Sequence, residues 1–201
     1  MDPAKIHIGT SGWSYKHWMG TFYPEGLKQA DQFEYLRKYF DTVEINNSFY
    51  RLPTVATFEK WKKSAFRGFL FAVKASRYIT HMKKLTDARQ NTRLFFNRTA
   101  HLSKKLGPIL FQLPPGWKVN VDRLASFVAD LPKKWNYAFE FRNATWYDDK
   151  VYSILKEMNC AFCIYELGGH KSPEIVTANF VYVRLHGPEA KYQGDYSDSA
   201  L

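Results

Sequence analysis

Cysteine is scarce in this chain of 201 residues, which contains only Cys160 and Cys163. Two cysteines do not build the disulfide framework of a small secreted domain. No uninterrupted apolar run approaches the roughly 18 residues of a membrane helix. The N-terminal stretch MDPAKIHIGTSGW lacks a cationic segment followed by an apolar one. We therefore expect no signal peptide, no membrane partner and a cytoplasmic location.

Acidic residues are almost missing from the middle of the chain. From Lys60 to Lys118, fourteen lysines and arginines stand against one acid, Asp87, so this segment carries +13. The whole chain carries +10, and the remainder is slightly acidic. A basic block of this kind attracts polyanions, although many basic proteins use surface lysines only for solubility.

Hydrophobic residues, in contrast, make up 45% of the chain and aromatic residues 17%, enough for one sizeable core. Apolar strand-like runs alternate with amphipathic helical stretches. Strands are expected over 5–11, 42–46, 69–76, 109–114, 137–142, 160–167 and 180–187, and helices over 31–40, 54–65, 91–106, 121–131 and 147–158. A strand followed by a helix, repeated in this way, predicts parallel β/α units in one domain.

Local signals mark several helix ends. Asp31 and Glu34 have the spacing of a capping box. Asn120 is expected to cap the helix over 121–131, and Gly107-Pro108 to stop the helix over 91–106.

Seven parallel strands fit either an open doubly wound sheet or a (β/α) barrel. The stretch GTSGW after the first strand lacks the G-x-G-x-x-G spacing, which weakens a dinucleotide-binding interpretation. Gly9 and Gly12 allow a close backbone approach there. The stretch is either an anion-binding loop or a tight turn that seats Trp13.

The polar residues of the expected strands follow one pattern. They keep one parity within each strand and lie toward its C-terminal end. The set is Glu44, Asn46, Lys74, Ser76, Gln112, Glu140, Arg142, Arg184 and His186. The intervening residues, such as Ile45, Val73 and Leu185, are apolar and suit a side that faces helices. In a barrel, the polar set would line the rim where active sites of (β/α) barrels lie.

Buried carboxylates need partners because an unpaired charge is costly to remove from water. Lys74, Arg142 and Arg184 would supply cations for Glu44 across such a rim. A buried ion-pair network that only fixes register is the alternative. The same pattern on five strands favours a site.

Seven motifs in this sequence match one known family, in the family's order and over nearly the whole chain. They are IGTSGWSYKHW (8–18), FYP (22–24), VEINNSFYRLP (43–53), FAVKASRYITH (71–81), FQLPP (111–115), FEFRNATW (139–146) and VRLHGP (183–188). The chain thus resembles the domain of unknown function 72 (YecE-like) family. The resemblance implies a TIM-type (β/α) barrel, related in shape to the xylose isomerase and endonuclease IV barrels. It implies no agreed biochemical activity.

The resemblance also bears on the domain boundaries. Family members usually continue beyond YQGDYSDSAL with a helix, a further strand and a last helix. We therefore expect residues 1–201 to form a single (β/α) barrel domain that lacks its last β/α element at the C-terminus, with part of the rim missing.

An enzyme acting on an anionic substrate is the first functional hypothesis. Glu44 and Glu140 would act as acid and base, Lys74 would hold negative charge, and His186 would shuttle protons. The expected ligand-binding residues are Asn46, Tyr50, His81, Gln112, Arg142, Trp146 and Arg184. Hydrolysis of a phosphoester or nucleic acid is the leading reaction. Two carboxylates also suit a sugar-active hydrolase. Aromatic residues such as Trp146 would stack on the sugar or, alternatively, only pack the loops.

Nucleic-acid binding without catalysis is the second hypothesis. The stretch SRYITHMKK (76–84) places four cationic or imidazole side chains beside Tyr78, a combination that suits phosphates and a stacked base. The endonuclease IV shape points the same way, but a fold does not fix a function. Binding of a smaller phosphate ligand stays open as well.

The sequence gives little indication of a metal site or a redox site. No H-x-x-x-H pair appears, and the cations of the rim would repel a divalent ion, so we expect no metal. Cys160 and Cys163 form a C-x-x-C inside an apolar strand, where residues three apart face opposite sides, and they are interpreted as buried thiols. The sequence identifies no cofactor and no protein partner.

Overall fold

The structure, a computed structural model, describes residues 5–200. The chain forms two compact units. Unit 1 comprises Met1–Tyr78 and Asn91–Ile109, and unit 2 comprises Ile79–Gln90 and Leu110–Leu201. Both contain parallel strands joined through helices, so the α/β class expected from the sequence is confirmed.

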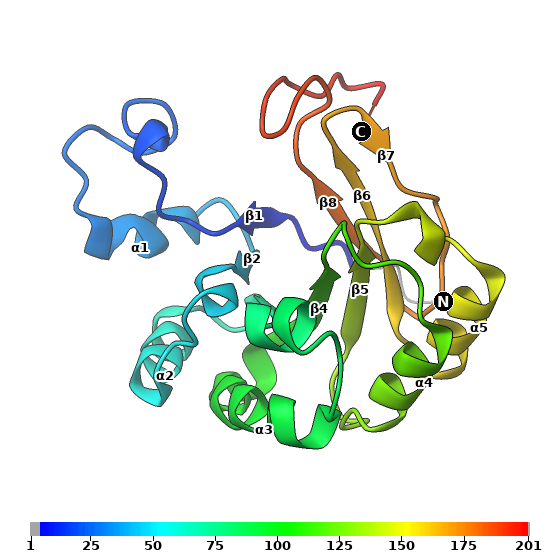
Figure 1. The fold of residues 1–201 in the computed structure, drawn as a ribbon. Coiled ribbons are helices and arrows are strands. Elements are labelled where there is room, and N and C mark those ends of the chain that lie inside the picture. Colours follow the sequence, from blue (N-terminus) through cyan, green and yellow to red (C-terminus); the bar gives the residue numbers. More distant parts are fainter. Residues whose placement is uncertain (1–4, 201) are drawn as a thin grey trace. The chain divides into compact units, whose positions relative to one another are not determined.

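The elements follow one another as expected along the chain (Figure 1). The strands are β1 (Gly9–Ser11), β2 (Thr42–Ile45), β3 (Leu70–Lys74), β4 (Leu106–Leu113), β5 (Tyr137–Phe141), β6 (Ala161–Leu167), β7 (His170–Lys171) and β8 (Tyr182–Leu185). The α-helices are α1 (Gln32–Leu36), α2 (Val55–Ser64), α3 (Ala88–Thr99), α4 (Val121–Ala129) and α5 (Asp149–Glu157). Short 3-10 helices span Lys16–Trp18, Gln29–Asp31, Asn47–Phe49, Ala100–Lys105 and Ala144–Trp146, and a π-helix spans Tyr78–Met82.

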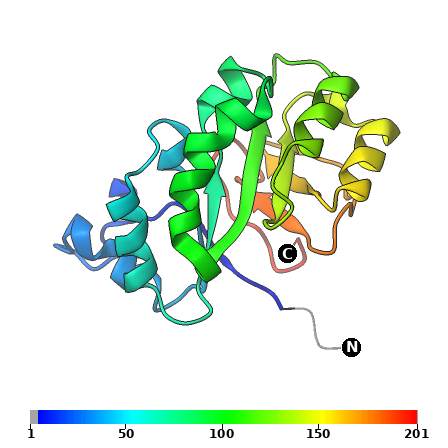
Figure 2. The ribbon, with the colours of Figure 1, turned by 90° about the horizontal axis from the view of Figure 1, so that it is seen from below.

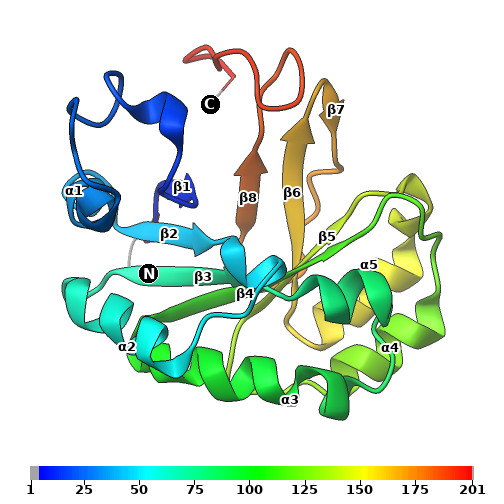
Figure 3. The same ribbon diagram turned by 60° about the vertical axis from the view of Figure 1, so that its left-hand side comes forward.

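In unit 1, β1, β2 and β3 lie side by side and parallel (Figure 3). The register pairs Gly9 with Thr42 and Thr42 with Leu70. A side chain at Gly9 would place its Cβ 2.0 Å from the Thr42 carbonyl oxygen, so this close approach requires glycine. The prediction of a close backbone approach at Gly9 is thus confirmed.

The turn after β1 uses its second glycine differently. Gly12 has a positive φ of 87°, and its N–H donates to the carbonyl of Glu44 over 2.9 Å. That N–H therefore belongs to the backbone ladder and is not presented to an anion. Trp13 packs on Phe33, with ring centroids 5.3 Å apart. These contacts favour the tight-turn interpretation.

Two of the predicted helix-end signals are wrong. Asp31 makes no side-chain cap hydrogen bond, and Glu34 pairs with Arg37 instead, so no capping box forms. Helix α3 ends at Thr99, and Gly107 and Pro108 lie inside β4. A Cβ at Gly107 would lie 3.3 Å from a carbonyl oxygen of β3, so this glycine allows two strands to approach closely.

In unit 2, β5 and β8 each pair with β6 in parallel, and β7 folds back on β6 as an antiparallel hairpin. The hairpin turns at Gly168 and Gly169, which both have positive φ. A strand of two residues carries no period that a sequence pattern can reveal, so β7 was not predicted.

Helices α4 and α5 pack beside each other in unit 2 (Figure 2). The predicted cap of α4 is confirmed, because the Asn120 side chain accepts a hydrogen bond from the N–H of Arg123 over 2.9 Å. Asp148 caps α5 in the same way from the N–H of Lys150.

The predicted pattern of burial holds for some strands and is wrong for one. Ile45 and Val73 are fully buried, as expected of residues that face helices. Leu185 on β8 is 46% exposed and Val183 is 53% exposed, so this face of β8 is only partly covered within residues 5–200. Cys160 and Cys163 are buried free thiols, as predicted, and burial raises the pKa of Cys160 to about 12.

Within residues 5–200, no helix has both the length and the apolar character needed to cross a membrane.

Candidate functional site

The candidate residues fall into two groups, one in each unit. Unit 2 contains His81, Gln112, Glu140, Arg142, Trp146, Arg184 and His186, and unit 1 contains Glu44, Asn46, Tyr50 and Lys74. Each group has its own buried carboxylate, which organises the polar contacts around it.

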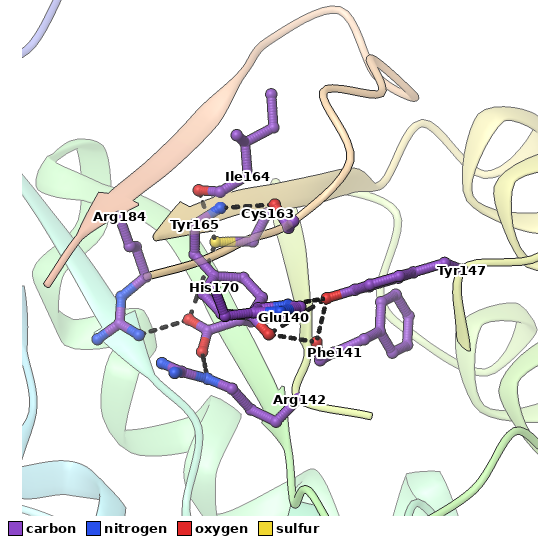
Figure 4. A network of polar contacts seen from close by, with 10 residues as sticks. Glu140, Phe141, Arg142, Tyr147, Cys163, Ile164, Tyr165, His170 and Arg184 are labelled. Carbon is purple, nitrogen blue, oxygen red and sulfur yellow. Dashed lines mark hydrogen bonds and ion pairs between the residues drawn. The ribbon is translucent and has the colours of Figure 1, made fainter. Parts of the chain in front are cut away.

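Glu140 is the centre of the group in unit 2 (Figure 4). It lies on β5 and is fully buried. Its Oε1 accepts a hydrogen bond from the Nε–H of Arg142, and its Oε2 accepts one from a terminal amino group of Arg184. The Sγ of Cys163 lies 3.9 Å from Oε2. The sequence pattern had predicted Glu140, Arg142 and Arg184 for one site, and the fold brings these three side chains together.

The guanidinium of Arg142 lies against the ring of Tyr165, with its central carbon 4.4 Å from the ring centroid. Contacts of this kind stabilise a cation in a partly desolvated site. Tyr165 donates its hydroxyl to the carbonyl of Phe141 over 3.1 Å. The Tyr147 hydroxyl lies 3.2 Å from that of Tyr165 and 2.9 Å from Nε2 of His170. A chain of polar groups thus leads from the arginine to the hairpin of β6 and β7.

The two phenols of this chain stay protonated. Burial is the main cause that raises the pKa of Tyr147, and its hydrogen bond to Tyr165 raises it further. Burial is also the main cause that raises the pKa of Tyr165. Neither phenol therefore adds negative charge near neutral pH. The formal charges of Glu140, Arg142 and Arg184 sum to +1.

Other predicted residues of unit 2 lie in different surroundings. His186 is 9% exposed, and its ring meets that of Tyr192 edge-on with centroids 5.5 Å apart. Nδ1 of His81 lies 2.9 Å from the hydroxyl of Thr80 within the π-helix. Gln112 is half-buried on β4.

Trp146 is placed as part of the protein interior. It is fully buried, stacks on Phe141 and donates its indole N–H to the carbonyl of Trp117 over 2.7 Å. Its ring faces are used by protein contacts, so it supports the end of β5 and does not stack on a ligand as the sequence had predicted.

Glu44 is the centre of the group in unit 1. It is 6% exposed on β2 and accepts a hydrogen bond from the Ser11 hydroxyl over 2.7 Å. The side-chain amide of Asn46 donates to the same hydroxyl oxygen over 2.5 Å. The Lys74 ammonium lies 4.5 Å from the ring centroid of Phe49. Tyr50 is 81% exposed and touches the same phenylalanine edge-on.

The sequence interpretation missed Ser11, Tyr147, Tyr165 and His170. Tyr165 shares a side of β6 with Cys163, but the approach of that thiol to Glu140 is visible only in the structure. Ser11 had a weak signal, as the last residue of the first strand. Tyr147 lies in the loop before α5 and His170 on the two-residue strand β7, and neither segment has a period that indicates direction.

The described part of the chain contains no group of three or more histidine, cysteine, aspartate or glutamate side chains arranged to hold a metal ion.

Comparison with known proteins identifies relatives of this chain. The family model described as "Protein of unknown function DUF72" matches residues 7–201. The UPF0759 protein YunF of Bacillus subtilis is 28% identical over 90% of this chain and 70% of its own length. The UPF0759 protein YecE of Escherichia coli K12 is 25% identical over 71% of this chain, and the match spans half of the relative's length.

Solved structures of similar proteins agree with this result. A DUF72 family protein of Thermotoga maritima, TM1631, is 27% identical, with a TM-score of 0.80 over 90% of this chain and 74% of that one. A DUF72 family protein of Enterococcus faecalis, EF0366, shares the fold at 21% identity, with a TM-score of 0.72 over 98% of this chain and 75% of that one. The chain therefore belongs to the DUF72 family, whose function is unknown.

Proposed function

We propose that the protein binds a phosphate-bearing ligand through Glu140, Arg142 and Arg184. The observation that carries this proposal is a fully buried carboxylate that holds two guanidinium groups and leaves a net charge of +1. Two guanidinium groups held by one carboxylate can attract a ligand that supplies negative charge. Buried ion clusters of this kind are concentrated at functional sites.

Phosphate is favoured among anions because the planar guanidinium fork matches its oxygens. Glu140 occupies the Nε–H of Arg142, so the two terminal amino groups of that arginine can donate to a phosphate oxygen. Tyr165 fixes the plane of the guanidinium from one side. These contacts hold the Arg142 guanidinium in a fixed orientation, which supports a binding group that is preorganised for the ligand.

The proposal extends from binding to catalysis, with hydrolysis of a bound phosphoester as the reaction. Both oxygens of Glu140 are engaged by arginines, so we assign it a positioning role instead of acid–base work. His186 follows Arg184 by two residues and suits proton transfer near neutral pH. Glu44 and Lys74 of unit 1 stay predicted catalytic residues.

Nucleic acid is the second candidate ligand, and the charge of unit 1 favours it. That unit has sixteen lysines and arginines against seven acids, a net charge of +9. A surface of this charge attracts the phosphate backbone without reading sequence. A sugar-active hydrolase that uses Glu44 and Glu140, closure of the strands into a TIM-type barrel, and a cytoplasmic location all stay predictions.

Calorimetric titration with inorganic phosphate and with a single-stranded oligonucleotide tests the proposal. Arg142→Lys keeps the positive charge beside Glu140 and removes the fork. We expect about tenfold weaker phosphate binding, equivalent to about 1.4 kcal/mol. Arg89→Lys is the matched control, because Arg89 lies in the same unit with its side chain 84% exposed.

Equal phosphate affinity in the wild type and Arg142→Lys would overturn the proposed site. Oligonucleotide binding that falls steeply with salt in both proteins, with no phosphate binding, would instead indicate surface attraction by the basic unit.

A further inference from the structure

Unit 1 contains a cavity that is separate from the arginine cluster. Its volume is about 650 Å³, and all of its lining residues belong to unit 1. The lining includes Gly12–Tyr15, which directly follow β1, and Asn46 and Asn47, which directly follow β2. The carboxyl ends of parallel strands are where ligands bind in α/β proteins. The volume lies in the range of about 300–1,000 Å³ that is typical of ligand sites.

Aromatic side chains form one part of the cavity wall. Trp13 and Trp61 meet edge to face, with ring centroids 5.2 Å apart and planes at 89°. Trp13 also packs on the buried ring of Phe33. Both tryptophans are half-buried and line the cavity, so each is held by protein contacts and keeps surface toward it. Rigid indole rings of this kind offer flat apolar faces at a low entropic cost.

Polar groups line the rest of the cavity, and one of them has a defined orientation. The Ser11 hydroxyl gives its single proton to Glu44, so its oxygen can only accept from the amide of Asn46. This contact fixes which end of the Asn46 amide is the donor and which is the acceptor. The acceptor, Oδ1, is buried and has no hydrogen-bond partner within residues 5–200. Buried polar atoms are normally satisfied, and a ligand hydroxyl would satisfy this one.

Charge in the cavity wall argues against an anionic ligand. Asp31 and Glu34 stand against Lys60, a balance of −1 inside a unit that carries +9. The Glu34 carboxylate is already paired with Arg37, so Asp31 and Lys60 leave the wall close to neutral. The wall therefore offers a phosphate no net attraction, and it suits a neutral ligand.

We propose that this cavity binds a neutral saccharide. Pyranose rings present C–H faces that pack on indole rings, and their hydroxyls both donate and accept hydrogen bonds. The carboxamides of Gln29, Asn46 and Asn47 offer both functions and lie on two different segments of the wall. A nucleobase would stack equally well but presents polar groups only along its edges, so it would leave much of the polar wall without partners. The site is therefore independent of the phosphate site proposed for unit 2.

Saturation-transfer NMR with the intact chain tests this inference. The probes are glucose, N-acetylglucosamine and their β-1,4-linked disaccharides, each at about 10 mM so that a Kd near 1 mM is detected. Adenosine is the competing probe. We expect transfer to the ring C–H protons of at least one saccharide, and at least fivefold weaker binding in Trp61→Phe and in Asn47→Ala. Asn97→Ala is the matched control, because Asn97 is exposed in the same unit and does not line the cavity.

Three results would overturn the proposal. The first is no transfer to any saccharide of the panel. The second is binding that Trp61→Phe and Asn47→Ala leave unchanged. The third is displacement of the saccharide by adenosine at a lower concentration, which would make the cavity a nucleoside site.

Discussion

Glu44 and Glu140 are both buried glutamates near the ends of parallel strands, yet their surroundings differ. Glu140 holds two guanidinium groups in unit 2, and Glu44 accepts a hydrogen bond from the neutral Ser11 hydroxyl in unit 1. The first arrangement fixes two cations on one carboxylate. In the second arrangement, Ser11 donates to Glu44 and accepts from the amide of Asn46, so Glu44 fixes the orientation of that amide through Ser11. The same residue type at the same strand position therefore prepares two different kinds of site.

The two units also differ in net charge, which can be compared with the charge of the candidate site in each. Unit 1 carries +9, but its cavity wall carries −1. Unit 2 has thirteen lysines and arginines against twelve acids, a net charge of +1, and its Glu140 cluster alone accounts for that value. Net charge therefore describes long-range attraction, whereas the charge of a site depends on the few side chains that the fold brings together.

Loss of the carboxylate at Glu140 should have the largest effect of the changes that test this comparison. Glu140→Gln removes the charge that both Arg142 and Arg184 contact, and removing one partner from a buried ion pair destabilises by about 3–5 kcal/mol. Urea unfolding of the variant measures the loss. Glu174→Gln, at an exposed glutamate of the same unit, should change stability by less than about 0.5 kcal/mol.

A loss below about 1 kcal/mol in Glu140→Gln would contradict the view that this carboxylate compensates the two arginines. Added phosphate should restore part of the lost stability, because a bound anion stabilises the folded state by mass action.

Changes around Glu44 should have a smaller effect. In Glu44→Gln the amide oxygen still accepts from Ser11, so we expect a loss of about 1 kcal/mol or less. Ser11→Ala removes both the donor to Glu44 and the acceptor for Asn46, and we expect a loss of about 1–2 kcal/mol. Urea unfolding of both variants beside the wild type checks the order. If Glu44→Gln is the more destabilising of the two, the carboxylate charge itself matters more than its link to Ser11.

Much of the fold and part of the site could be predicted from the sequence. The order of elements followed from alternating periodicities, and Glu140, Arg142 and Arg184 followed from parity within their strands. Parity is a local property, so it says which side a residue faces but not which residue of another strand it meets. The partition of the candidate residues between two units depends on tertiary contacts that parity does not encode.

The errors have similar physical causes. Gly107 and Pro108 resemble a helix stop, but β4 runs through them because Gly107 allows close contact between strands. Leu185 has the pattern of a residue that faces a helix, and its exposure depends on what else is packed on β8. Tyr147, from the loop before α5, meets His170, from the two-residue strand β7, and neither segment has a sequence period that indicates direction.

The smallest expected effect is the change in folding stability at alkaline pH, which tests a buried neutral group, the Tyr137 phenol. Burial raises the pKa of Tyr137, which is 4% exposed and donates its hydroxyl to the carbonyl of Pro132 over 2.7 Å. The unfolded chain therefore loses this proton first, as the pH passes about 10. Its contribution to stability is complete below that pH and is lost as the pH rises toward the folded pKa, with a slope of up to about 1.4 kcal/mol per pH unit.

Tyr137→Phe should therefore be less stable than the wild type at pH 7, by about 1 kcal/mol for the lost hydrogen bond. Between pH 9 and about 11, Tyr137→Phe should lose less stability than the wild type. The stability difference between the two proteins therefore becomes smaller or changes sign. Urea unfolding at several pH values measures both parts. Tyr50→Phe, at a residue 81% exposed, is the control and should follow the wild type throughout. A constant difference between Tyr137→Phe and the wild type would mean that the buried phenol titrates alike in both states, and that the hydrogen bond to Pro132 alone explains its contribution.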